Sequence, residues 1–130
     1  MPAINIYVLA FGIALVAIAA AELFYPAAAF RLWSRWVSHS LFRLHGLVLV
    51  ASGFPLTLFR GAMHGGVFAL GFVIVLTAPF ILIYPEKIRR MFETISLEMD
   101  EDGVRRVMYI EAFVRAAAGI FFITAALASR

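Results

Sequence analysis

The sequence predicts an all-α membrane protein: a four-transmembrane-helix bundle made of two parallel-repeat helical hairpins, with amphipathic helices at the membrane interface. The 130 residues are 64% hydrophobic and only 15% charged, and the mean hydropathy is +0.96. A soluble domain is roughly half apolar and about a quarter charged. The apolar residues also gather in four runs, each near the ~20 residues that a helix needs to cross a bilayer. We therefore expect one integral membrane domain, residues 1–130.

The four predicted spans are residues 4–24, 41–59, 63–84 and 107–127. A signal peptide is an alternative for the first, because AIAAAE at 17–22 is similar to a cleavage site. No basic residue precedes this run and it is longer than a signal-peptide core, so we expect a retained span. Pro55 and Pro79 should kink the second and third spans. The glycine-rich segment RGAMHGG at 60–66 between them predicts a tight turn.

Basic residues predict the orientation. Eight of them lie in the two long connections after the first and third spans, and two lie on the opposite side. The two sets are Arg31, Arg35, Arg43, Lys87, Arg89, Arg90, Arg105 and Arg106, against Arg60 and Arg130. Because cytoplasmic loops are enriched in Lys and Arg, the long connections should be cytoplasmic and both termini should face outward.

Both long connections show helical amphipathic periodicity, at about residues 27–39 and 86–101. We expect helices that lie flat on the membrane, although docking grooves for a cytoplasmic partner are an alternative. In the second connection, Glu86 with Arg90 and Arg89 with Glu93 are spaced for ion pairs, and Gly103 is a candidate helix stop. Four aromatic residues are candidate anchors at headgroup depth: Tyr25, Trp33, Trp36 and Tyr84.

The two halves of the chain are similar to each other. FYPAAAFRLW at 24–33 aligns without gaps with IYPEKIRRMF at 83–92, and HGLVLVASGF at 45–54 lies over EAFVRAAAGI at 111–120. Proline disfavours helix in the residue before it and is tolerated in the first turn of a new helix. Each Tyr-Pro should therefore end a span and start an interfacial helix. We expect repeats at 4–59 and 63–128, related by a pseudo-twofold axis along the membrane normal.

APFILIYPEKIRRM at 78–91, followed by an apolar span, resembles the YjeT-like family of small bacterial inner-membrane proteins. The first half is similar too, with Glu22, the Tyr-Pro at 25–26 and FRLHGLVLVASG at 42–53. The family unit is not duplicated, and Glu111 and Arg115 stand where it has a glycine-rich stretch. The resemblance implies a bacterial cytoplasmic (inner) membrane location. Together with the four apolar runs and the basic-residue pattern, it leads us to expect a multi-pass protein with both termini in the periplasm. It implies no activity.

Five polar residues form a candidate intramembrane cluster in the cytoplasmic half: Glu22, Arg43, His45, Glu111 and Arg115. Glu111 and Arg115 are one turn apart, and only 13 residues follow before Ser129, about 20 Å of helix. At least Arg115 should therefore lie at membrane depth, where ionisable residues are costly and are functional candidates. A structural ion pair facing the bundle interior is the favoured interpretation, and an ion, proton or polar-ligand site is the alternative.

Other chemistry has little support. The chain has no cysteine, so disulfides, Fe–S clusters and Cys-ligated zinc are excluded. His45 and His64 fall near opposite ends of their spans and His39 is in a connection, so we expect no haem and no metal site. The serines lack a His–Asp constellation, and there is no phosphate-binding loop. We expect no cofactor, and the net charge of +3 does not suggest nucleic-acid binding.

Three functions remain from the sequence. The favoured one is non-enzymatic: a structural or interaction protein, working as a homo-oligomer or an accessory subunit of a membrane complex. The alternative is a small oligomeric transporter or channel with an intramembrane Glu/Arg site. A lipid-modifying membrane enzyme has only the interfacial polar cluster in its favour. The expected partners are the lipid bilayer and either a second copy or another membrane protein.

Overall fold

The computed structural model describes residues 2–129, and in this range all regular secondary structure is helical, as predicted. The elements are α1 (Ala3–Phe24), α2 (Pro26–Ser38), α3 (Leu44–Gly53), the 3₁₀-helix η1 (Phe54–Leu58), α4 (His64–Ile83), α5 (Pro85–Glu98) and α6 (Glu101–Ala128).

Three helices within residues 2–129, α1, α4 and α6, are long and apolar enough to cross a membrane. The second predicted span is shorter than expected. It consists of the 10-residue helix α3 and the five-residue η1, because the chain changes to 3₁₀ geometry around Pro55. Together they are about 25 Å long from their helical rises. In contrast, α4 continues as an α-helix through Pro79.

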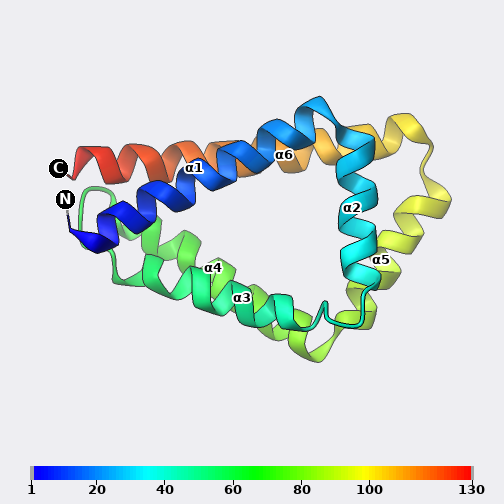
Figure 1. The fold of residues 1–130 in the computed structure, drawn as a ribbon, viewed down its shortest axis with the longest axis horizontal. Helices are drawn as coiled ribbons and strands as arrows, with labels where there is room; N and C mark the ends of the chain where they lie inside the picture. Colours follow the sequence, from blue (N-terminus) through cyan, green and yellow to red (C-terminus); the bar gives the residue numbers. More distant parts are fainter. Residues whose placement is uncertain (1, 130) are drawn as a thin grey trace.

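The helices of the predicted spans pair across the two halves of the chain. Helix α1 packs along α6, and α3 packs along α4 (Figure 1). The two pairs approach each other at the end that holds both chain termini, the narrow end, and diverge toward the end where α2 and α5 cross, the wide end (Figure 1). The two helices of each predicted hairpin therefore diverge from each other. Each of them packs along a helix from the other half of the chain.

Both Tyr-Pro pairs separate two helices, as predicted. Tyr25 follows α1 with φ −133° and ψ 62°, and Tyr84 follows α4 with φ −125° and ψ 52°. The amide of each tyrosine still donates to the carbonyl four residues earlier. Pro26 and Pro85 then occupy the first position of α2 and α5, where the missing N–H costs nothing. The same local chemistry therefore makes the same turn twice.

Glycines allow both helix pairs to approach closely. A Cβ added at Gly12 would lie 2.7 Å from the carbonyl oxygen of Gly119, and the reverse distance is also 2.7 Å. In the other pair, a Cβ at Gly71 would lie 3.1 Å from the carbonyl oxygen of Gly53. The neighbour is backbone in each case and cannot rotate away. Small residues at such crossings are typical of membrane helix packing.

At the wide end, Arg89 of α5 binds the C-terminus of α2. Its Nε donates to the carbonyl of Val37 at 2.7 Å, and Nη2 donates to the carbonyl of His39 at 3.0 Å. Carbonyls at a helix C-terminus lack helical partners and attract cations. The predicted ion pair of Arg89 with Glu93 is therefore wrong. The contact between α2 and α5 also includes stacked rings of Phe30 and Phe92.

One further expectation needs correction. Gly103 does not stop a helix; it lies in the first turn of α6, where its amide donates to Asp100 Oδ1 at 2.8 Å. Asp100 is an N-cap, a role that this residue type favours, and α6 is consequently longer than its predicted span. In the turn at 59–63, the left-handed residue is Met63 (φ 57°), whereas the described glycines have negative φ.

Candidate functional site

Glu22, Glu111 and Arg115 form one contact cluster between α1 and α6. Arg115 Nη2 lies 2.8 Å from Glu111 Oε1, one turn earlier on the same helix, which is the predicted ion pair. Arg115 Nη1 contacts Glu22 Oε1 on α1. The sequence does not predict this second contact, because spacing along one helix says nothing about which other helix packs on it. We call these three residues the charged triad.

The two carboxylates of the charged triad differ in exposure. The side chain of Glu22 is only 2% exposed, and that of Glu111 is 38% exposed. Glu22 Oε2 is buried and has no hydrogen-bond partner among residues 2–129. A buried carboxylate without full pairing is costly. Glu22 is therefore the structural member of the triad, and Glu111 is the accessible one.

One aromatic ring of α2, that of Trp33, contacts the triad and links it to further rings. The guanidinium of Arg115 lies 5.4 Å from the centroid of the Trp33 ring, a cation–π distance. Trp33 and Trp36 both meet the ring of His45 edge to face, at 6.3 and 6.1 Å. His45 is thus linked to the triad through Trp33 and makes no direct contact with it.

Arg43 lies apart from the other candidate residues. It precedes α3 and is exposed, and its side chain makes no hydrogen bond or ion pair with any described residue. Among the predicted anchors, Tyr25 and Tyr84 are exposed, at 70% and 46%. Trp33 and Trp36 are half-buried and contact other rings inside the wide end. The role of all four as headgroup anchors stays a prediction.

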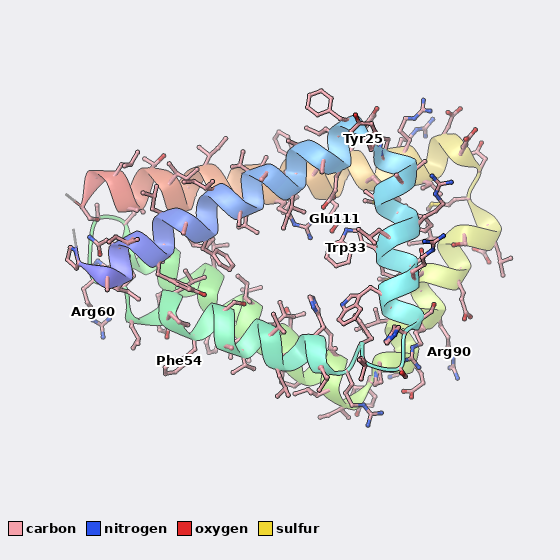
Figure 2. All side chains as sticks on the ribbon, in the orientation of Figure 1. Tyr25, Trp33, Phe54, Arg60, Arg90 and Glu111 are labelled. Atoms are coloured by element: carbon pink, nitrogen blue, oxygen red, sulfur yellow. The ribbon has the colours of Figure 1, made fainter. Side chains whose placement is uncertain are left out.

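A cavity of about 450 Å³ lies between the two helix pairs, next to the triad. Residues from four helices line it: Phe11, Leu15, Leu49, Leu70, Val73, Ile74, Glu111, Val114, Arg115, Ala118 and Phe122. Only Glu111 and Arg115 are polar, so the cavity has apolar walls and one charged end. Figure 2 shows Glu111 and Trp33 in the space enclosed by the helix pairs and α2.

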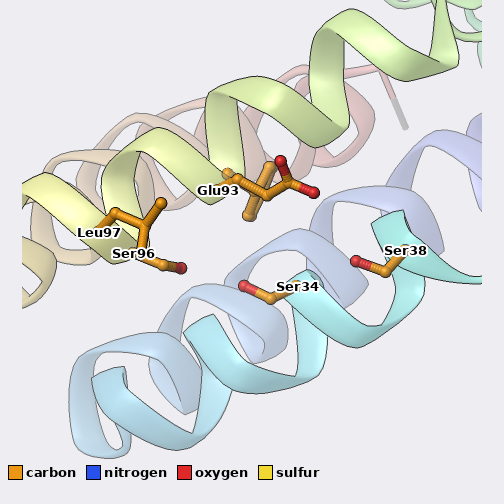
Figure 3. Close-up of a pocket in the computed structure, with 6 residues that line it drawn as sticks. Ser34, Ser38, Glu93, Ser96 and Leu97 are labelled. Carbon is orange, nitrogen blue, oxygen red and sulfur yellow. The ribbon is translucent and has the colours of Figure 1, made fainter.

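A second, smaller cleft of about 270 Å³ lies between α2 and α5. Ser34 and Ser38 of α2 face Glu93, Ser96 and Leu97 of α5 (Figure 3). Its polar groups are hydroxyls and one carboxylate, which suit hydrogen bonding to a polar partner.

In the part of the chain that the structure describes, no three His, Asp or Glu side chains converge as a metal-ligand set. No family model matches the chain, and no curated protein or solved structure matches it. Two features of the structure bear on function: an apolar cavity and a charged triad at one end of it.

Proposed function

We propose that this chain is a non-enzymatic integral membrane protein that binds a small molecule within the bilayer, as a binding protein or carrier. The cavity between the helix pairs is the observation that supports this most. Ligand pockets measure about 300–1,000 Å³ and have mainly apolar walls with a few polar groups. The cavity fits this description, and among the described residues its walls hold no serine, threonine or histidine. That composition favours binding over catalysis.

The proposal places four segments in the membrane: α1, α3 with η1, α4 and α6. Large apolar side chains on their outer surfaces support this, such as Phe80, Ile110 and Phe113, which are 62%, 67% and 75% exposed. In water such surfaces would be unfavourable, whereas in lipid they are solvated. At about 25 Å, α3 with η1 falls short of the ~30 Å hydrocarbon layer, a mismatch that local thinning accommodates.

We further propose a bacterial inner membrane with the wide end in the cytoplasm and both termini in the periplasm. The excess of basic residues in the two long connections supports this orientation. Arg60 lies at the narrow end and Arg90 at the wide end (Figure 2). The resemblance to YjeT-like proteins supports the choice of membrane.

The two halves are proposed to be repeats, 4–59 and 63–128. The alignment that matches the two Tyr-Pro pairs also places Gly12 over Gly71, and Gly53 aligns with Gly119. These four residues form the two close helix contacts. The contact between α1 and α6 is therefore equivalent to the contact between α4 and α3, as a pseudo-twofold axis requires.

A second candidate function is association, as a homo-oligomer or an accessory subunit. The cleft between α2 and α5 favours it, because Leu97 at its edge is 87% exposed. The sequence alone favours association; we place binding first because the cavity lies beside the triad.

Native mass spectrometry of the chain purified in mild detergent separates the two candidates. If the chain is a binding protein, the spectrum should show one chain with a bound small molecule. Val73→Trp should lose this molecule, because the larger side chain fills the cavity from an exposed position in its wall. Val48→Trp, at an exposed position of α3 that does not line the cavity, is the matched control and should retain it. A stoichiometric second chain, with no small molecule in either variant, would favour association instead.

A further inference from the structure

The charged triad lacks one positive charge. Glu22 and Glu111 each contact a terminal nitrogen of Arg115, so two carboxylates share one guanidinium. No other basic side chain contacts these groups within residues 2–129. In a medium of low dielectric constant, an uncompensated charge is expensive. A cation from outside the chain would balance it.

The burial of the two carboxylates, Glu22 and Glu111, indicates where a balancing cation binds. Glu22 is almost completely enclosed, and its unpartnered Oε2 has no open side. Glu111 lines the cavity and is 38% exposed. A cation can therefore reach the triad only at Glu111, from the cavity.

The other cavity walls define the rest of the ligand. From α1, α4 and α6, Phe11, Leu70, Val73 and Phe122 present hydrocarbon to a volume of about 450 Å³. A hydrated inorganic ion would leave these walls without a partner, whereas an apolar body would bury them. Two of the wall residues, Phe11 and Phe122, are aromatic, and aromatic rings favour an organic cation.

We propose that the cavity binds an amphipathic organic cation, with its cationic head at Glu111 and its apolar body between the two helix pairs. This inference rests on the proposed binding function and names its ligand class. It also explains why two carboxylates lie beside one arginine: Arg115 neutralises the buried Glu22 and leaves Glu111 for the ligand.

Two ions of nearly the same shape and opposite charge test this directly. Tetraphenylphosphonium and tetraphenylborate binding to the full chain is measured in lipid nanodiscs, with empty nanodiscs as the blank. We expect tetraphenylphosphonium to bind at least about tenfold more tightly than tetraphenylborate, and Glu111→Gln to weaken it by at least about tenfold. Glu111→Asp should retain part of the affinity. Glu98→Gln, an exposed carboxylate on α5, should leave it unchanged.

Glu111→Gln should remain folded because Arg115 keeps Glu22, and its melting temperature verifies this. Failure of tetraphenylphosphonium to bind, as expected if a retained proton balances the triad, overturns the inference. Equal binding of both ions, insensitive to Glu111→Gln, also overturns it. If that binding is nevertheless abolished by Val73→Trp, the binding function stands and only the cationic ligand class is wrong. If Val73→Trp has no effect on binding of either ion, both proposals fail.

Discussion

Arg115 has two carboxylate partners, and their different burial decides how each substitution in the charged triad should behave. The Glu111–Arg115 pair could be predicted because residues four apart share a helix face. The contact with Glu22 could not, because it depends on α1 packing against α6. Two signals in the sequence point toward it: Glu22 is the only charged residue in the first predicted span, and the predicted topology places it in the same half of the membrane as Arg115.

Arg115→Gln should be the most destabilising change in the triad, by about 3–5 kcal/mol, because it leaves buried Glu22 without a counter-charge. Glu22→Gln should cost about 1–3 kcal/mol, since it removes one buried contact. Glu111→Gln should cost less than about 1 kcal/mol, because this side chain is partly exposed. Thermal unfolding in detergent measures the order, and Arg106→Gln, exposed on the same helix, is the neutral control.

The double variant Glu111→Gln/Arg115→Gln distinguishes the triad from a simple pair. A pair predicts that the double change is milder than either single change. The triad predicts that it is as severe as Arg115→Gln, because Glu22 is still left alone. Recovery of most of the stability in the double variant would contradict the contact with Glu22.

At the scale of the elements, the sequence predicts where one helix ends and the next begins at each Tyr-Pro pair. It does not predict the length of every helix. Tyr-Pro fixed where α1 and α4 end, because proline acts through its own ring and the residue before it. The start of α6 is not predictable from the pattern, because Gly103, which suggests a helix stop, donates its amide hydrogen to Asp100 in an N-cap. The close approach at Gly12 was also missed, since a single glycine in an apolar run carries no information about its neighbour.

Gly12→Ala should destabilise the α1–α6 pair by about 1–3 kcal/mol, because the new methyl group would lie 2.7 Å from a backbone carbonyl. This loss should exceed the gain in helix propensity of about 1 kcal/mol. Gly65→Ala is the matched control. Nothing lies within 4 Å of its added Cβ, so it should be neutral or slightly stabilising. Equal melting temperatures for both variants would argue against the close contact of α1 with α6.

At the scale of the whole molecule, composition predicted the helical class, while the pairing of spans needed the structure. The sequence suggests two hairpins because its two halves are similar to each other. Instead α2 and α5 hold the spans of each half apart at the wide end (Figure 1). The cavity and the triad both follow from this arrangement, and neither is encoded in the spacing of residues along one segment.

We expect the short second segment, α3 with η1, to cross the membrane and to form one wall of the cavity through Leu49. The chain has no cysteine, so Arg43→Cys and Arg60→Cys each introduce one thiol, at the two ends of that segment. Both positions are exposed. A membrane-impermeant maleimide applied to intact bacterial cells should label position 60 and should label position 43 only after the membrane is permeabilised. Labelling of both positions from the same side would contradict the four-crossing architecture.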